Sequence, residues 1–207
     1  PTFIFTHDSI SIGSDGPTHQ PIEQLAMLRA IPNMYVFRPA DKNEIIGTWD
    51  FILKLKDRPS TIALSRSEAP LLNVNPEMVQ FGAYIVRKEE KQLHGIIIAT
   101  GTEVHTALRI AETLKVKEGL DIRVISMPCM ELFLEQKEEY RKMLLPIGVR
   151  TFVIEAGSSF GWHQFVYNQS YLMTLDQFGI SGPKDEVLKY AKFDQDTIME
   201  RIKERLK

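Results

Sequence analysis

The chemically richest stretch of the sequence is THDSISIGSDGPTHQ, residues 6–20. Its titratable side chains are His7, Asp8, Asp15 and His19. The stretch follows an apolar run at residues 3–5 and ends where Pro21 opens a helical pattern of apolar residues. This order predicts a strand, a glycine-containing loop and a helix, and α/β folds place much of their chemistry on such loops. Any one of these residues could instead satisfy the backbone of a turn, but the cluster as a whole favours a ligand site.

The residue types indicate what kind of ligand this site would take. His7 follows one predicted strand and Arg66 follows another, so both could face a cleft at the carboxyl ends of a parallel sheet. His19 precedes a helix N-terminus, where backbone N–H groups favour anions, and an arginine can bind an oxyanion with two parallel hydrogen bonds. Asp15 offers acceptors for hydroxyl groups. The set fits a polyhydroxylated, phosphorylated ligand, although Arg66 alone could equally be a solvated surface charge.

Two other uses of the same stretch are weaker. His7, Asp8, Asp15 and His19 could bind a metal ion, but their spacing matches no helical or hairpin metal motif and no thiolate is near. The serines of the stretch lack the nucleophile-elbow pattern of hydrolases. Further along, the turn at residues 100–102 lacks the glycines and lysine of a phosphate-binding loop, so it reads as a tight turn before a helix.

Composition narrows the class of protein. The chain has 207 residues, 43% of them hydrophobic, a formal net charge of −2 and a single cysteine. That cysteine, Cys129, excludes an internal disulfide framework, is expected to be buried, and suits a reducing cytoplasmic setting. No run approaches the roughly 18 apolar residues of a membrane span. Because no basic stripe is present, nucleic acid is an unlikely partner.

The hydrophobic pattern predicts two α/β units. Strands are expected at residues 3–5, 34–37 and 61–65, with a helix from Pro21 to about Pro32 and a second helix started by Asp41 and Glu44 at capping-box spacing. After a stretch rich in proline and asparagine, a second rhythm places strands at residues 95–99, 122–126, 151–155 and 171–175. A helix is expected around residues 132–144 and another from residue 194. The predicted domains are therefore residues 1–70, an incomplete parallel-sheet unit, residues 71–90, a linker and entry, and residues 91–207, a smaller complete α/β domain.

Two further expectations concern the surroundings of these domains. A strand within two residues of Pro1 has nothing before it to pair with, which suggests that part of the protein is missing. The run EAGSSFGW at residues 155–162 is expected to shape a contact between domains or between subunits, with a place beside the active site as the alternative. The histidines at positions 94, 105 and 163 have no partner in sequence and read as structural.

Long motifs then give the sequence a family resemblance. The stretches THDSI, DGPTHQPIEQLA, VFRPAD, LSR at residues 64–66, ATGTEV, EAGSSFGW and LDQFGISGP resemble transketolase, in the order in which that family carries them. The resemblance covers essentially the whole chain. It corresponds to the later part of the pyrimidine-binding domain, which belongs to the thiamine-diphosphate-binding fold, followed by the C-terminal domain.

The resemblance implies an activity and a role for each candidate residue. Transketolases move a two-carbon ketol unit between sugar phosphates, using thiamine diphosphate and a divalent metal, Mg or Ca. His7 and Arg66 match the residues that grip the substrate phosphate, and Asp15 matches the aspartate that binds a donor hydroxyl. His19 matches the catalytic histidine near the reactive end of the donor. A homodimer is implied as well, because the family's active site lies between subunits.

The sequence also departs from the family. Ser14 stands where an acidic residue is usual, and we expect this to change local hydrogen bonding only. The glutamate that activates the cofactor's aminopyrimidine, and the domain that holds the diphosphate and metal, have no counterpart in these residues. The chain alone is therefore expected to be inactive, and to act as part of a larger enzyme or as a split subunit with a separate N-terminal section. The alternatives are a non-catalytic dimerisation or docking fragment and, among enzymes, 1-deoxy-xylulose-5-phosphate synthase, which shares a DGPTH-like signature.

Overall fold

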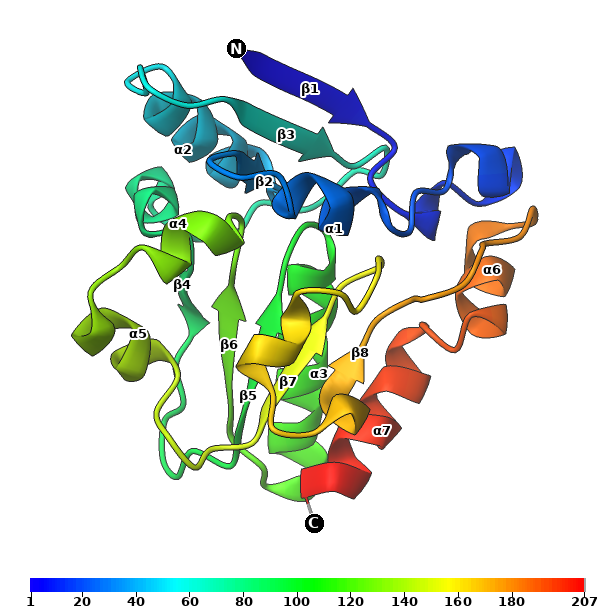
Figure 1. The fold of residues 1–207 in the computed structure, drawn as a ribbon. Helices are drawn as coiled ribbons and strands as arrows, with labels where there is room; N and C mark the ends of the chain where they lie inside the picture. Colours follow the sequence, from blue (N-terminus) through cyan, green and yellow to red (C-terminus); the bar gives the residue numbers. More distant parts are fainter. Residues whose placement is uncertain (207) are drawn as a thin grey trace.

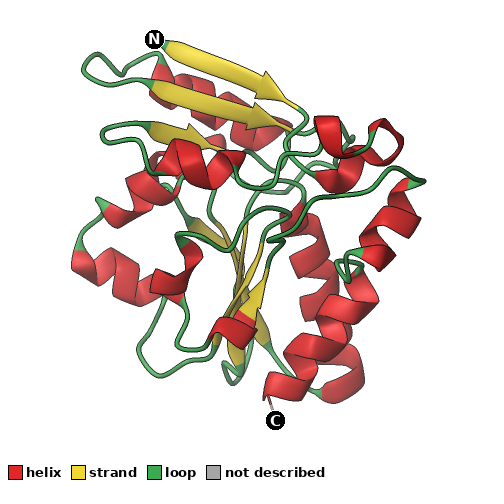
Figure 2. Cartoon of the chain, turned by 45° about the vertical axis from the view of Figure 1, so that its right-hand side comes forward, coloured by secondary structure: helices red, strands yellow, loops and turns green. Residues whose placement is uncertain are grey.

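The computed structural model describes residues 1–206 as two α/β units, one above the other in Figure 2. The first unit holds a three-stranded parallel sheet in the order β1-β3-β2. Its strands are β1 (Thr2–Thr6), β2 (Tyr35–Phe37) and β3 (Ser60–Leu64), and its helices are α1 (Gln24–Arg29) and α2 (Lys42–Ile52). The α/β class and the parallel sheet predicted for this unit are confirmed.

The second unit is built on a five-stranded mixed sheet in the order β4-β6-β5-β7-β8. Its strands are β4 (Tyr84–Arg87), β5 (Gly95–Ala99), β6 (Ile122–Ser126), β7 (Thr151–Ile154) and β8 (Leu172–Met173). Its helices are α3 (Glu103–Glu118), α4 (Met130–Leu134), α5 (Glu138–Leu144), α6 (Lys184–Tyr190) and α7 (Gln195–Leu206). Only β4 is antiparallel to its neighbour, β6. Because β4 belongs to this sheet, the second unit takes in residues before position 91.

Alternating side chains explain why the central strand β5 is a continuous apolar run. Ile97 packs into a cluster with Ile110 of α3 and Ile202 of α7, on one face of the sheet. Ile96 and Ile98 point to the other face, into the cluster that contains residues of α4 and α5. Successive residues of a strand face opposite sides, so a strand covered on both faces must be apolar throughout. Figure 1 shows α3 and α7 on one side of this sheet and α4 and α5 on the other.

Several predicted boundaries move in the structure. Helix α1 begins at Gln24 rather than at Pro21, and the expected helix at residues 132–144 is two short helices, α4 and α5. Asp41 caps α2 as predicted, since its Oδ1 accepts a hydrogen bond of 2.9 Å from the Glu44 backbone N–H. The return half of the capping box is missing, because the Glu44 carboxylate instead accepts from the backbone N–H of Ala40 and from the hydroxyls of Tyr84 and Ser126. Those hydroxyls belong to the second unit, so tertiary contacts redirect a locally predicted side chain.

Strand β1 is the edge of the first sheet among the described residues. It pairs only with β3, and its apolar side chains Phe3, Ile4 and Phe5 are all about half exposed, at 44%, 52% and 48%. An apolar edge strand of this kind offers unpaired backbone groups to another polypeptide. The N-terminus lies on this strand, far from the C-terminal end of α7 (Figure 1). Within residues 1–206, every helix is too short or too polar to span a lipid bilayer.

Short helical segments connect the main elements. They are η1 (Ile10–Asp15), η2 (Pro17–His19), η3 (Pro76–Phe81), η4 (Trp162–Phe165) and η5 (Gln169–Tyr171). Segment η3 packs directly against α2 at Gly47: a Cβ there would lie 2.0 Å from the Pro76 carbonyl oxygen and 2.8 Å from Val79. Only glycine fits this contact, which accounts for Gly47 in the interior of α2.

We expect Gly47→Ala to lower the free energy of unfolding by about 1–3 kcal/mol, the usual range for overpacking. Helix propensity alone would favour alanine by up to about 1 kcal/mol, so the sign of the change tests the contact. Urea unfolding followed by circular dichroism measures it. The control Asp50→Ala, at an exposed position of the same helix, should change stability by less than about 0.5 kcal/mol. A Gly47→Ala protein more stable than wild type would refute the proposed close packing.

Candidate functional site

A cavity of about 490 Å³ opens beside the carboxyl ends of β1 and β3. The residues that line it and matter below are Phe5, His7, His19, Leu28, Ala63 and Phe178. All but Phe178 come from the first unit. Ligands of parallel α/β sheets bind beyond the carboxyl ends of the strands, so the cavity lies where the sequence predicted a site.

His7 and His19 meet at this cavity from two different segments. His7 directly follows β1, and His19 ends η2; their ring centroids are 5.7 Å apart. Each imidazole Nδ1 forms a hydrogen bond with the hydroxyl of the preceding threonine, Thr6 at 2.7 Å and Thr18 at 2.9 Å. Within residues 1–206 these are the only hydrogen bonds of the two rings, so their remaining nitrogens are available to a ligand. The backbone of His7 has φ = 64°, a left-handed conformation that is uncommon outside glycine and often found at functional sites.

The other two predicted site residues lie outside the lining of this cavity. Asp15 ends η1 and Arg66 follows β3 by two residues, and both side chains are exposed. Neither has a side-chain partner among the described residues, so both are free to move onto a ligand. The structure thus brings His7 and His19 together and leaves Asp15 and Arg66 on loops at the same end of the sheet. Their predicted ligand contacts stay predictions.

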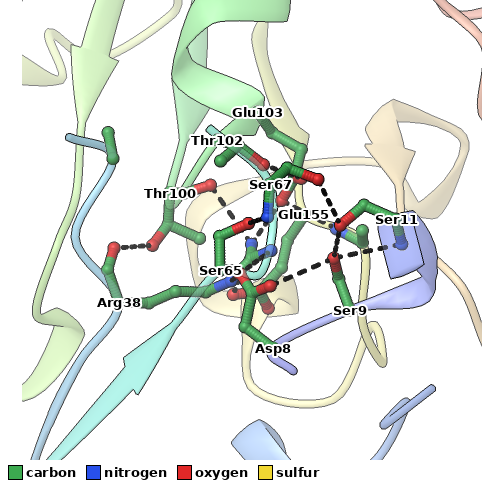
Figure 3. A network of polar contacts seen from close by, with 12 residues as sticks. Asp8, Ser9, Ser11, Arg38, Ser65, Ser67, Thr100, Thr102, Glu103 and Glu155 are labelled. Atoms are coloured by element: carbon green, nitrogen blue, oxygen red, sulfur yellow. Dashed lines mark hydrogen bonds and ion pairs between the residues drawn. The ribbon is translucent and has the colours of Figure 1, made fainter. Parts of the chain in front are cut away.

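Behind the cavity, the first unit is joined to the second by a buried arginine. Arg38, directly after β2, is fully buried, and its Nε donates to Asp8 Oδ2 at 2.9 Å (Figure 3). Its Nη1 donates to the Thr100 carbonyl at 3.1 Å and to the Glu103 carboxylate, both in the second unit. Its Nη2 lies 2.8 Å from Asp8 Oδ2. One guanidinium therefore fixes the residue next to His7 and the start of α3 at the same time.

A second arginine completes the ionic cluster. Arg29 at the end of α1 makes two hydrogen bonds of 2.8 Å to the two carboxylate oxygens of Glu155, which follows β7. The indole Nε1 of Trp162 donates to the same carboxylate at 2.5 Å, and the Arg29 guanidinium lies 5.1 Å from the Trp162 ring centroid. Nearby, the Ser158 N–H donates to the Ile22 carbonyl at 2.8 Å. The expectation that EAGSSFGW shapes a contact between domains is confirmed.

The charges of this cluster are set by burial and by the arginines. Burial is the largest single influence on Glu155 and would raise its pKa. The charges of Arg29 and Arg38 and the hydrogen bonds from Arg29 and Trp162 together outweigh burial, so the pKa lies below the usual glutamate value. For Glu103, burial dominates and raises the pKa even though Arg38 is in contact. The arginines therefore favour the charged form of Glu155, and Arg29 is the arginine that pairs with it directly.

The same geometry bears on the metal alternative. Asp8, one of the four residues considered as ligands, is 4% exposed and bonded to Arg38. Within residues 1–206, no group of three histidine, cysteine, aspartate or glutamate side chains could hold a metal ion.

Cys129 is buried, as predicted, and burial raises the pKa of its thiol well above the usual value.

Sequence reasoning singled out neither the Arg38 cluster nor its role. A signal was present, because Asp8, Arg38 and Glu155 each lie at or shortly after the end of a strand, as His7 and Arg66 do. Strand-end position alone does not tell a ligand-binding charge from one that pairs inside the protein. Only the burial of the arginine separates the two roles.

Two stacked α/β units with histidines at the carboxyl edge of a parallel sheet define a two-domain α/β protein with a candidate ligand site. Comparison with known families makes this more specific. A family model described as the transketolase pyrimidine-binding domain matches residues 1–70, and one described as the transketolase-like C-terminal domain matches residues 82–194. The chain belongs to the transketolase family.

Individual relatives agree with this assignment. The chain is 42% identical over 207 residues to a transketolase of Staphylococcus epidermidis, covering 98% of this chain and 31% of that protein. The crystal structure of a transketolase variant from Pichia stipitis superposes with a TM-score of 0.92 at 37% identity, over 99% of this chain and 30% of that one. A protein described as a split gene transketolase, inactive β4 tetramer, has a TM-score of 0.77 at 19% identity, covers 99% of this chain and 66% of that one, and shares the fold. The chain thus spans about a third of the length of the curated relatives that it matches.

Removing the charge of Glu155 tests the ionic cluster. We expect Glu155→Gln to lower the free energy of unfolding by about 3–5 kcal/mol at pH 7, because it leaves the buried Arg29 uncompensated. Since the folded-state pKa of Glu155 is lowered, its contribution is complete above the unfolded value of about 4.3 and is lost as the pH falls through the folded value. The difference between wild type and Glu155→Gln should therefore shrink below about pH 4. Urea titrations at a series of pH values measure both effects.

The control for this variant is Glu138→Gln, which breaks an exposed pair with Lys142 at the same charge change. It should leave stability nearly unchanged. Equal losses in the two variants would contradict the special role of the buried cluster.

Proposed function

We propose that this chain supplies the sugar-phosphate-binding part of a transketolase active site. In the complete enzyme a two-carbon ketol unit would pass from a ketose phosphate to an aldose phosphate. The observation that carries the proposal is the approach of His7 and His19 to 5.7 Å at a cavity beyond the parallel strands, in a chain of this family. Two imidazoles with free nitrogens can donate hydrogen bonds to phosphate or sugar oxygens, or exchange a proton with a hydroxyl.

Each candidate residue then has a separate role. His7 and Arg66 hold the phosphate group, Arg66 through its two-pronged guanidinium. The carboxylate of Asp15 accepts hydrogen bonds from a hydroxyl of the donor sugar and so senses its configuration. His19 lies near the reactive end of the donor, where it orients the carbonyl and moves a proton to or from the adjacent hydroxyl. Leu28 and Phe178 add apolar surface to the lining of the same cavity.

Thiamine diphosphate would supply the carbon nucleophile of the reaction. The residues described here fit only part of that cofactor's surroundings. The cavity has apolar walls and two imidazoles, which suit a sugar next to a heteroaromatic ring. The diphosphate and its divalent metal, Mg or Ca, do not fit, because within residues 1–206 no cluster of carboxylates and histidines could coordinate a metal ion. We propose that a further stretch of polypeptide, outside these residues, provides the ligands for the diphosphate and the metal.

The exposed edge of β1 supports such a second polypeptide. Its half-exposed apolar residues and unpaired backbone groups are the features of a strand that another strand covers. The occupant proposed is the N-terminal section of the enzyme, carried on the same chain or on a separate one, with two copies of the assembly forming a dimer in the cytoplasm. A non-catalytic fragment that only docks through this edge is the second candidate, favoured by the same exposed strand.

A hybrid enzyme tests the ketol-transfer role. This chain replaces the matching segment of the Staphylococcus epidermidis transketolase, and ketol transfer between pentose phosphates is measured. We expect an active hybrid in which His19→Ala lowers kcat by at least about 100-fold, the usual contribution of a proton-transferring side chain. Arg66→Ala should raise KM for the sugar phosphate by roughly 10- to 100-fold, as expected for a lost charge-assisted contact.

The matched control is Arg58→Ala. Arg58 is partly exposed, is paired with Glu135, and precedes β3, at the end of the first sheet opposite to the cavity. It should leave both kinetic constants unchanged. A hybrid that assembles normally but transfers no ketol unit would favour the docking alternative.

Cofactor binding by the isolated chain gives a separate test. Calorimetric titration with thiamine diphosphate and Mg²⁺ should give no binding at micromolar concentrations, since the diphosphate and metal have no ligands here. The hybrid should bind under the same conditions. Micromolar or tighter binding by the isolated chain would contradict the proposed division of the site.

A further inference from the structure

The loop that carries Asp15 and His19 is held by a segment of the other unit. Residues 178–184, which lead from β8 into the first residue of α6, run beside η1 and η2, as the orange and dark-blue ribbons of Figure 1 show. The contacts between the two segments involve groups 160 or more residues apart in sequence. They are therefore set by how the two units pack, not by local chain geometry.

Gln20 is the centre of this contact. It directly follows His19 and is 3% exposed. Its Nε2 donates to two carbonyl oxygens, that of Gly13 in its own loop at 2.9 Å and that of Ile180 in the other unit at 3.0 Å. One side-chain amide thus closes the loop from residue 13 to residue 20 and ties it to the second unit.

The surrounding glycines leave no room for this amide to move. A Cβ on Gly179 would lie 1.8 Å from Gln20 Oε1. A Cβ on Gly13 would lie 2.9 Å from the Gly182 carbonyl oxygen. Gly13 also has φ = 68°, a backbone conformation that residues other than glycine rarely adopt. Gly179 therefore packs directly against the Gln20 side chain, and the backbones of the two units meet at Gly13 and Gly182.

Two more hydrogen bonds extend the same contact. The Ser181 hydroxyl donates to the Ser14 carbonyl at 2.7 Å, next to Asp15. The Lys184 Nζ donates to the Ser67 hydroxyl at 3.2 Å, next to Arg66. The segment thus contacts both loops that carry the residues proposed to bind the sugar phosphate.

We propose that Gln20 is a positioning residue, and that residues 179–184 of the second unit act through it to set the positions of His19 and Asp15. The positioning role rests on the function proposed above, whereas the mechanical role stands on the contacts alone. A general packing role explains these contacts less well. Within residues 1–206, Gln20 Oε1 is buried without a hydrogen-bond partner, a cost that an apolar side chain of the same size would avoid. An apolar side chain could not donate hydrogen bonds to the carbonyl oxygens of Gly13 and Ile180, as the Gln20 amide does.

Hydrogen exchange of the purified chain tests the mechanical role. Gln20→Met keeps the size of the side chain and removes the shared donor; Gly179→Ala displaces the amide without changing any residue of the loop. In both variants, exchange in peptides covering residues 13–20 should become about tenfold faster, the effect of losing hydrogen bonds of ordinary net strength. Exchange in β5 and β7 should not change. Gln136→Met is the matched control, because Gln136 Nε2 donates to a single carbonyl, that of Leu132.

If either variant folds poorly, Ser181→Ala provides a milder test, since it removes only the bond to the Ser14 carbonyl. It should speed exchange in the same peptides by about two- to threefold, as one weak exposed hydrogen bond would. Unchanged exchange at residues 13–20, or a uniform increase over the whole chain, would overturn the proposal.

Kinetics of the hybrid enzyme then test the positioning role. Gln20→Met should lower kcat/KM for the phosphorylated donor about tenfold through KM as well as kcat, because Asp15 and His19 are displaced together. Unchanged constants in spite of a loosened loop would show that the contact does not position the site. An inactive wild-type hybrid would count against the proposed function, while the exchange result would still decide whether the contact holds the loop.

Discussion

The buried guanidinium of Arg38 is the interaction on which the rest of the structure depends. Its side chain bonds to Asp8, Glu103 and the Thr100 carbonyl, and its backbone is held as well: its N–H donates to the Pro128 carbonyl at 2.8 Å, and its carbonyl accepts from the Gly101 N–H at 3.0 Å. A buried charge costs several kcal/mol unless its hydrogen-bonding groups are paired. Because the partners come from both units, the charge is balanced only when the two units are docked in this one arrangement.

This constraint reaches the candidate site in two ways. Asp8 is bonded to Arg38, and its neighbour His7 has a left-handed backbone and lies beside His19. Gly101 must be glycine, since a Cβ would lie 2.7 Å from the Arg38 guanidinium carbon, and so the start of α3 can approach the first unit. The ionic cluster therefore joins the two units and also holds the residue next to one of the two cavity histidines.

The second unit contacts the site loops at two separate places. Arg38 and its partners hold the residue next to His7, while residues 179–184 hold the loop of Asp15 and His19. Together these contacts explain why a domain that contributes only Phe178 to the cavity can still influence it. A domain that contacts two loops can set the spacing between the side chains that those loops carry.

How far the sequence predicted this structure depends on the range of the interactions involved. The α/β class, the parallel first sheet, the cap of α2 by Asp41 and the burial of Cys129 followed from local patterns, because strand periodicity, capping and burial of apolar runs are properties of short segments. Family motifs marked His7, Asp15, His19 and Arg66. The boundaries that moved, such as the start of α1, are those that a few tertiary contacts decide.

The sequence by itself determined the two units, the strand-end positions of the charged residues and the family to which they belong. It could not decide which of those charges face a ligand and which pair inside the protein. Arg38 and Arg66 both follow strands, yet one is fully buried between the units and the other is exposed. That difference arises only when the units dock, because burial and pairing depend on residues such as Glu103 and Glu155 that are distant in sequence. The tertiary structure also decided the place of Gln20, whose single amide joins carbonyls 167 positions apart, from Gly13 to Ile180.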